Sequence, residues 1–153
     1  MDIIVREANV EDDAAIGSVL QSVDWLWAAE WSEETLEAAA RRFLESSGAA
    51  PSSVVLIAER AGEGLGFVAL HLYPSIREGW EGYVSHLFVR AGARGAGVGR
   101  RLLAAAEEAA KARGCGRLML YVNRPRPAYQ RGFYVKVGWQ EHETAALFFR
   151  KLT

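Results

Sequence analysis

Apolar positions along the chain switch between a two-residue period and a helical period, which predicts strands interleaved with helices. Runs rich in β-branched and apolar residues, typical of strands, occupy residues 3–8, 53–60, 65–73, 80–89, 116–122 and 144–152. Gly62 and Gly64 stand between the second and third of these runs and predict a hairpin turn.

Helical periodicity fills the intervals between these strands. Asn9 is a helix cap followed by an acidic first turn, and Ser32 opens a second helix in the same way. A third helix is predicted over Gly99–Gly114, with the last glycine as its C-cap. A short fourth helix is predicted over residues 126–139, with Pro127 in its first turn and Gly138 past its end.

The order of these elements predicts an α/β protein with a mixed sheet and helices packed on it. The chain has 153 residues, shows no repeat and carries no linker-like tract. A chain of this length buries roughly 70% of its unfolded surface on folding, so it needs no disulfide or metal to be stable. We therefore expect a single domain over residues 1–153.

Composition limits the partners, disulfides and cellular location to be expected. The formal net charge is −1, which gives no reason to expect a nucleic-acid or membrane partner. A single cysteine cannot form an internal disulfide. No apolar run approaches the roughly 18 residues of a membrane span, and we expect a cytoplasmic location.

The segment Val89–Leu103, "VRAGARGAGVGRRLL", stands out between a predicted strand and a predicted helix. Glycines allow positive φ angles and close approach of a ligand to the backbone. A helix N-terminus presents unpaired N–H groups and about half a positive charge. Arg94, Arg100 and Arg101 add fixed positive charge. We interpret the segment as a phosphate or pyrophosphate site rather than a solvated turn.

Two familiar phosphate loops do not fit the spacing. Gly92 and Gly97 have the separation of a P-loop, but the lysine and hydroxyl residue that must follow are missing. Gly95 and Gly97 begin a dinucleotide fingerprint, but Arg100 stands in place of its third glycine.

The sequence that does fit is R-G-A-G-V-G, Arg94–Gly99, which resembles the R/Q-x-x-G-x-G/A loop of the GNAT superfamily of N-acetyltransferases. Asn123 and "GFYVKVGW", Gly132–Trp139, are similar to the family's Asn and F-Y-x-x-x-G-F/W motifs. The order of elements agrees over nearly the whole chain. The chain departs from the pattern in a longer spacing between Asn123 and Tyr134, and in Gln130, where a small residue usually stands.

The resemblance implies a GNAT-like three-layer fold, a central mixed β-sheet with splayed parallel strands flanked by about four helices. It implies acetyl-CoA as co-substrate, bound where the two parallel strands separate, and no metal. The pantetheine arm would pair with backbone groups of one strand, in the manner of an added strand. The implied cofactor-binding residues are Leu87, Phe88, Val89, Arg94, Gly95, Ala96, Gly97, Val98, Gly99, Arg100, Asn123 and Tyr134.

The resemblance also assigns Tyr134 as the general acid in direct attack of a primary amine on the thioester. A phenol with a pKa near ~10 is protonated at neutral pH and can donate to a leaving thiolate. The alternative interpretation is a core aromatic residue, a place that the adjacent Phe133 can fill.

The general base is sought on the strand over residues 80–89. Strict alternation gives two faces, one with Glu81, Tyr83, Ser85 and Leu87 and the other with Val84, His86 and Phe88. Ser85 and Glu81 are predicted to act in catalysis by holding a water on the first face. His86 titrates in the useful range, but it shares their face only if a bulge rotates it.

The acceptor amine is predicted to be a small molecule or a peptide. Trp25, Trp27 and Trp31 either pack in the core or wall the acceptor, with Asp24 or Glu30 meeting its ammonium group. The closing strand could pair across a homodimer. The identity of the acceptor, the oligomeric state and the use of a longer acyl-CoA stay open. Alternatives in other classes are a non-catalytic acyl-CoA-binding sensor or interaction module, and a nucleotide-binding domain with a different loop.

Overall fold

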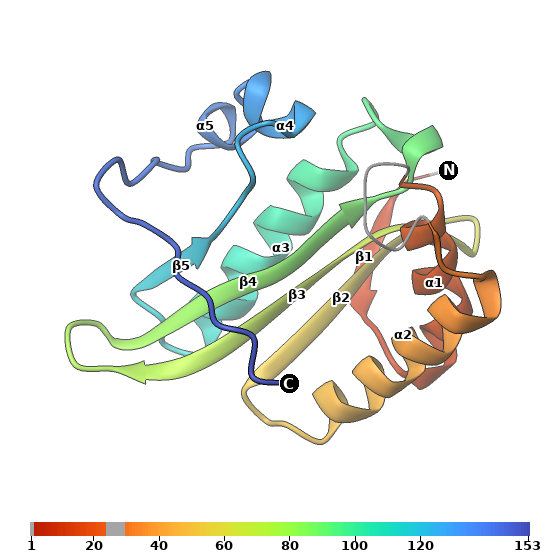
Figure 1. Ribbon diagram of the computed structural model, residues 1–153, viewed down its shortest axis with the longest axis horizontal. Coiled ribbons are helices and arrows are strands. Elements are labelled where there is room, and N and C mark those ends of the chain that lie inside the picture. The colour runs from red at the N-terminus through yellow and green to blue at the C-terminus, as the bar shows by residue number, and fades with distance from the viewer. Residues whose placement is uncertain (1, 24–29) are drawn as a thin grey trace. The chain divides into compact units, whose positions relative to one another are not determined.

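The computed structural model describes residues 2–23 and 30–153, which form two compact units, Met1–Met119 and Leu120–Thr153 (Figure 1). All the buried hydrophobic side chains of the described residues, from Ile3 to Ala110, belong to the first unit. That unit therefore contains the hydrophobic core, and the core holds the sheet and its helices together.

A five-stranded sheet has the order β1-β2-β3-β4-β5. Its strands are β1 Ile4–Glu7, β2 Ser53–Arg60, β3 Glu63–Ser75, β4 Gly79–Val89 and β5 Arg117–Leu120. The first four strands pair antiparallel, whereas β5 runs in the same direction as β4 (Figure 1). The predicted mixed sheet is confirmed.

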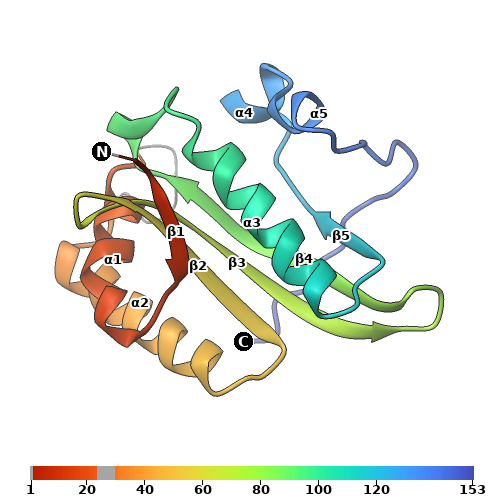
Figure 2. The same cartoon turned by 180° about the vertical axis from the view of Figure 1, so that it is seen from behind.

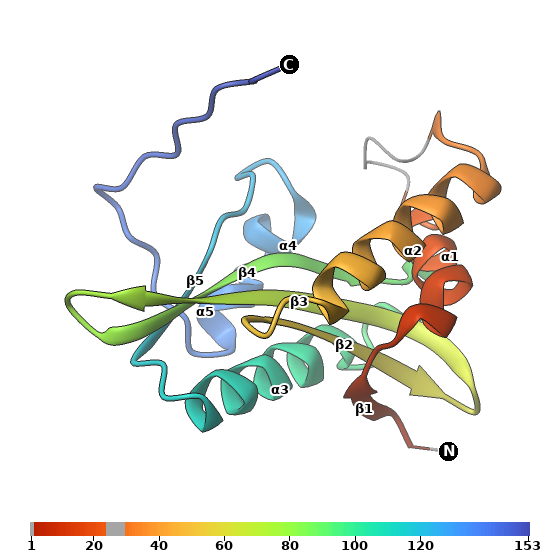
Figure 3. The ribbon, with the colours of Figure 1, turned by 90° about the horizontal axis from the view of Figure 1, so that it is seen from below.

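Helices cover both faces of the sheet. The 3-10 turn η1 Val10–Asp12 leads into α1 Asp13–Gln21, and α1 packs beside α2 Glu33–Gly48 on one face. On the other face lies α3 Val98–Ala112 (Figures 2 and 3). The predicted layered α/β architecture is thus confirmed. No helix in the described part of the chain is long and apolar enough to cross a membrane.

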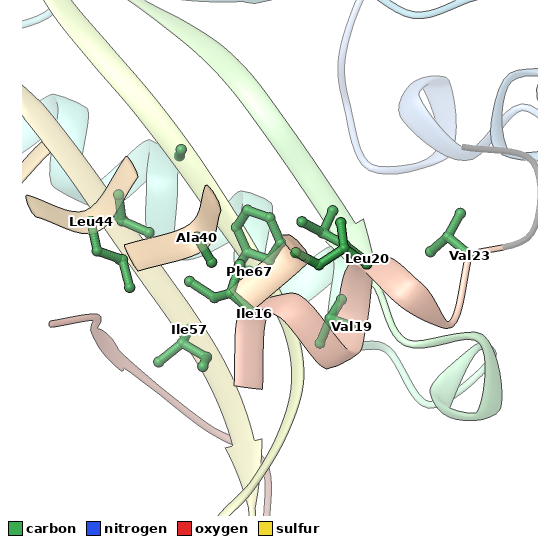
Figure 4. Close-up of a cluster of buried hydrophobic side chains, with 11 residues drawn as sticks. Ile16, Val19, Leu20, Val23, Ala40, Leu44, Ile57 and Phe67 are labelled. Carbon is green, nitrogen blue, oxygen red and sulfur yellow. The ribbon is translucent and has the colours of Figure 1, made fainter. Parts of the chain in front are cut away.

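The layers are joined by two sets of buried side chains. The face under α1 and α2 contributes Phe67, Ile57, Val55 and Ala69 to a cluster with Ile16, Val19, Leu20, Val23, Leu36, Ala40 and Leu44 (Figure 4). On the α3 side, the buried residues of the helix are Val98, Leu102, Leu103, Ala106 and Ala110. Each fully buried Leu, Ile, Val or Phe stabilises the fold by roughly 1.5–3 kcal/mol relative to an exposed one.

The β2–β3 turn is tighter than predicted. Ala61 and Gly62 have φ angles of 51° and 79° and make the turn. Gly64 lies inside β3 opposite Glu59, so the prediction that it belongs to the turn is wrong. A Cβ at Gly64 would lie 3.0 Å from the Cβ of Ala15. This glycine therefore serves the packing of α1 against the sheet.

The second unit contains two short helices, α4 Pro127–Gln130 and α5 Phe133–Lys136, in place of the one helix predicted. Gly132 separates them with a φ of 72°. Pro127 at the start of α4 and Gly138 after α5, with a φ of 97°, stand where the sequence predicts a beginning and an end.

The predicted closing strand over residues 144–152 is wrong, because residues 137–153 form neither helix nor strand. The β-forming side chains of this segment, Leu147, Phe148, Phe149 and Leu152, are exposed. A strand exists only where a second strand takes its backbone hydrogen bonds, and sequence composition alone does not supply that partner.

Candidate active site

The loop between β4 and α3 has the conformation expected of an anion site. Gly95 and Gly97 have φ angles of 85° and 80°, and a Cβ at either position would meet open space. Both glycines are therefore required by backbone conformation and not by packing. Gly97 caps the 15-residue helix α3 without a side chain to accept from its first N–H groups. The amides at the start of α3 are thus available to a ligand.

The four arginines of this segment divide into two pairs. Arg90 donates to the carbonyl of Gly64 and the hydroxyl of Ser18, each over 2.9 Å. Arg101 donates to the carbonyl of Ile3 over 3.0 Å, so its guanidinium is engaged by backbone outside the loop. Arg94 and Arg100 are exposed and form no hydrogen bond or ion pair with a described residue. These two guanidinium groups are available to an anion.

β5 begins beside the start of β4, at the end of that strand away from the β4–α3 loop. The N–H of Gly116 donates to the carbonyl of Trp80 over 2.9 Å, which sets the start of β5 beside the start of β4. The four residues of β5 span about 13 Å, whereas Leu87 lies about 23 Å along the strand from Trp80. On its other edge, the segment Leu87–Val89 pairs with Gly66–Val68 of β3. β5 itself therefore ends before it reaches Leu87 and Val89.

A β-bulge interrupts β4 near its C-terminal end. Ala69 faces His86 and Leu70 faces Val84, so Ser85 is the extra residue. The bulge turns His86 and Phe88 to the α2 side, where their rings contact Phe67. The prediction that Leu87 shares the face of Ser85 and that His86 does not is therefore wrong. An inserted residue shifts the alternation by one from that point onward.

Hydrogen bonds link four side chains across β2, β3 and β4. Ser53 Oγ lies 3.1 Å from His71 Nδ1, and His71 Nε2 lies 2.9 Å from Ser85 Oγ. Ser85 Oγ lies 2.7 Å from His86 Nδ1 and 3.4 Å from the carbonyl oxygen of Ala69. Sequence analysis missed Ser53 and His71, because only the pairing register of the strands reveals that they meet Ser85.

His86 lies in a largely apolar environment. Its ring centroid is 5.1 Å from that of Phe43 on α2, 6.5 Å from Phe67 and 6.4 Å from Phe88. Burial lowers the pKa of His86, and the nearby His71 lowers it further. The imidazole is accordingly biased towards its neutral form, the form that can accept a proton.

Glu81 is buried, with one carboxylate oxygen hydrogen-bonded and the other ion-paired. Its Oε2 accepts from the Tyr73 hydroxyl over 3.1 Å, and its Oε1 lies 2.7 Å from Arg117 Nη2, outside hydrogen-bond geometry. The carboxylate therefore ties together β3, β4 and β5 at the end of the sheet away from the loop.

Tyr134 and Asn123 belong to the second unit. The Tyr134 ring meets Phe133 edge-to-face at 5.1 Å. Burial raises the pKa of Tyr134, and the charges of Arg126 and Arg131 oppose that rise. The phenol is consequently protonated at neutral pH. The side chain of Asn123 is exposed.

The predicted acceptor wall is only partly within the described residues. Trp31 and Glu30 are exposed just before the Ser32 cap of α2. Trp25, Trp27 and Asp24 lie outside the described residues.

A family model described as "Acetyltransferase (GNAT) family" matches residues 20–139, a range that contains the loop, the bulge and Tyr134. The chain belongs to the GNAT acetyltransferase family. The resemblance of the Arg94–Gly99 loop is thereby confirmed at the level of the family.

Individual relatives agree with this assignment. This GNAT chain is 40% identical over 76 residues to an aminoglycoside N(6′)-acetyltransferase type 1 of Klebsiella aerogenes, a match covering 48% of the chain and 50% of that protein. The chain thus spans about half the length of the curated relative it matches.

Solved structures share the fold over nearly the whole chain. A transcriptional regulator from Bacillus halodurans superimposes with a TM-score of 0.83 at 25% identity, covering 97% of this chain and all of that one. An aminoglycoside N-acetyltransferase in complex with CoA gives a TM-score of 0.75 at 18% identity, covering 99% of this chain and 96% of that one.

Proposed function

We propose that the protein is an N-acetyltransferase that moves an acetyl group from acetyl-CoA to a primary amine. The observation that carries the proposal is the β4–α3 loop. There, two glycines with positive φ angles precede a 15-residue helix whose first N–H groups have no side-chain cap. Membership of the GNAT family supports it.

The residues present fit the co-substrate. A pyrophosphate needs backbone N–H donors and fixed positive charge. The amides at the start of α3 and the guanidinium groups of Arg94 and Arg100 are proposed to supply them. An extended amide-containing arm can bind as an added strand, and the backbone of Leu87, Phe88 and Val89 at the end of β4 is proposed to pair with it. Asn123 is proposed as a further polar contact to the same molecule.

Acetyl-CoA, when bound, supplies a thioester whose carbonyl carbon is open to attack by an amine. Tyr134 donates its phenolic proton to the departing sulfur, because its raised pKa keeps the hydroxyl protonated at the operating pH. Ser85 lies at the bulge in β4 and is proposed to help remove the proton that the amine loses. Glu81 holds the β3–β4–β5 junction and through it the position of Ser85.

The acceptor is proposed to be a small-molecule amine. The curated relative is named for the 6′-amino group of aminoglycosides, which makes an aminoglycoside with a free 6′-amine the first acceptor to test. A peptide N-terminus is the second. The exposed Glu30 and Trp31 suit a cationic acceptor through charge and through the aromatic face.

The proposal is tested by incubating the protein with acetyl-CoA and a panel of amines. The panel holds a 6′-amino aminoglycoside, spermidine and a short peptide with a free N-terminus. Free thiol is measured as it forms, and mass spectrometry identifies an acetylated amine. Transfer to any amine supports the proposal. Binding of acetyl-CoA without transfer to any panel member supports a non-catalytic sensor instead.

A further inference from the structure

We propose that Ser53, His71, Ser85 and His86 form a proton relay that carries the amine's proton away from the active site. The inference rests on the proposed function and names the groups that complete it. His86 accepts the proton at Nε2, and the other three side chains are positioning residues that pass a proton outward.

The relay follows from the register of the sheet. Ser53 of β2 lies directly opposite His71 of β3, and the bulge in β4 presents both Ser85 and His86 to the same side. The three links measure 3.1, 2.9 and 2.7 Å. Without the inserted residue, strict alternation would turn His86 to the opposite face, and the chain would end at Ser85.

The two ends of the relay differ in environment. His86 Nε2 has no hydrogen-bond partner among the described residues, whereas Nδ1 is engaged by Ser85. The ring is surrounded by Phe43, Phe67 and Phe88. Ser53, at the other end, is half-buried and lines a surface pocket of about 440 Å³ with Glu7, Asn9, Ser47 and Arg113. A proton delivered to Ser53 therefore reaches solvent.

The proton balance requires one orientation of the hydrogen bonds. In the resting state His86 Nδ1–H donates to Ser85, Ser85 donates to His71 Nε2, and His71 Nδ1–H donates to Ser53. When the amine gives one proton to His86 Nε2, each donor passes its own proton one link along. Ser53 then releases one proton to water, and no net charge is left in the sheet.

The resting orientation makes a spectroscopic prediction that needs no turnover. Both His71 and His86 must carry the proton on Nδ1, so ¹⁵N spectra of the imidazoles in the free protein should show this tautomer for both rings. In a Ser85→Ala variant the link between the rings is lost, and the tautomers should redistribute. A wild-type protein with His71 protonated on Nε2 would overturn the relay, because Ser85 could then not donate to that ring.

The kinetic test compares His71→Gln with Ser52→Ala. The glutamine keeps a hydrogen-bonding side chain but cannot pass a proton, so kcat should fall by roughly 10²-fold, within the usual range of an acid–base contribution. Acetyl-CoA affinity, measured by calorimetry, should not change. Ser52 is exposed and next to Ser53 but outside the hydrogen-bonded chain, so its variant should retain the wild-type kcat and solvent isotope effect.

The outcomes separate the two proposals. If the wild type transfers acetyl groups and His71→Gln turns over within twofold of it, the relay is wrong and the proposed function stands. If the wild type binds acetyl-CoA but transfers to no amine, both fail. If His71→Gln does not fold, as judged by circular dichroism, the ¹⁵N tautomers of the wild type decide the matter alone.

Discussion

The guanidinium of Arg90, one residue past the end of β4, donates to the hydroxyl of Ser18 on α1 over 2.9 Å. The same side chain donates to the carbonyl of Gly64, and its backbone N–H donates to the carbonyl of Leu65 over 2.7 Å. Arg90 thus bonds the start of the β4–α3 loop to α1 and β3. The loop begins from a fixed point although its tip is exposed.

Replacing Arg90 by Met should therefore affect both stability and binding. Loss of hydrogen bonds to a charged group is expected to lower the free energy of unfolding by roughly 1.5–3 kcal/mol, and acetyl-CoA affinity should fall with it. Arg94→Met is the matched control, because Arg94 is exposed and has no hydrogen bond or ion pair with a described residue. It should weaken binding and leave Tm unchanged. Equal Tm values for wild type and Arg90→Met would contradict the fastening role.

Gly97→Ala tests the loop conformation itself. An L-residue at a φ of 80° carries a penalty of roughly 1–2 kcal/mol, and relief of that strain displaces the amides at the start of α3. We expect lower stability and weaker acetyl-CoA binding. Gly92→Ala, where φ is not positive and a Cβ meets nothing, should match the wild type in urea denaturation and in calorimetry. Indistinguishable variants would place the anion site elsewhere.

Gly66→Ala tests how closely β3 and β4 approach each other at the end of β4. The new Cβ would lie 2.6 Å from the carbonyl oxygen of Phe88 and 3.2 Å from Leu102. Backbone must move to relieve this contact, so we expect a loss of about 1–3 kcal/mol in the free energy of unfolding. Gly48→Ala at the end of α2 meets no atom and should be neutral or slightly stabilising. Urea denaturation of both variants measures the difference.

The substitution Asp12→Asn should change the free energy of unfolding by an amount that depends on pH. Arg6 donates to both oxygens of Asp12 over 3.0 and 2.8 Å, and the Asn9 N–H adds a bond of 2.8 Å. Arg6 holds the pKa of Asp12 below its ordinary value. A lowered carboxyl pKa stabilises the fold above the ordinary value and ceases to do so as pH falls through the lowered one.

The variant should accordingly be less stable than wild type at pH 7, by roughly 1–3 kcal/mol. This gap should close as the pH falls below the ordinary aspartate pKa and through the lowered pKa of Asp12. Asp2→Asn, at an exposed position, is the control and should show no gap at either end. Urea denaturation at a series of pH values gives the result. A gap that stays constant with pH would show that the charge of Asp12 is not what stabilises the fold.

Tyr134→Phe removes only the hydroxyl proposed to protonate the leaving sulfur. Acetyl-CoA affinity should persist, because the ring still packs on Phe133, while kcat should fall by about 10²–10⁴-fold. Because burial raises the pKa of Tyr134, the alkaline limb of the wild-type rate should lie above the ordinary phenol value of about 10. The variant should lack that limb.

The control is Tyr129→Phe, which removes a hydroxyl bound to Glu141 over 2.6 Å and placed outside the proposed chemistry. Its kcat and alkaline limb should equal those of the wild type. An unchanged kcat in Tyr134→Phe would exclude the tyrosine as the acid. A loss of affinity as large as the loss of rate would make it a binding residue only.

Much of the fold follows from local sequence, and the elements show why. β2 occupies the predicted Ser53–Arg60, because continuous apolar residues and the following glycine fix both ends. The glycine-rich turn before α3 was predicted for the same reason: positive φ at Gly95 and Gly97 favours glycine whatever lies nearby.

What sequence could not predict depends on pairing between distant segments. One inserted residue at Ser85 changes which side chains face α2, and only alignment with β3 reveals it. The link from Ser85 through His71 to Ser53 follows from that alignment, across 14 and 18 residues of chain. The prediction of a closing strand failed for the same reason. The composition of residues 144–152 favours a strand but does not show which strand could pair with it.

Calorimetric titration of acetyl-CoA into the wild type and into Gly97→Val tests whether the β4–α3 loop binds acetyl-CoA. We expect a single site of micromolar or somewhat weaker affinity in the wild type and none in the variant, with both proteins folded. At a hundredfold excess over Kd, binding should raise the free energy of unfolding by roughly 2.7 kcal/mol in the wild type. No heat and no rise in Tm for the folded wild type at saturating acetyl-CoA would contradict the account.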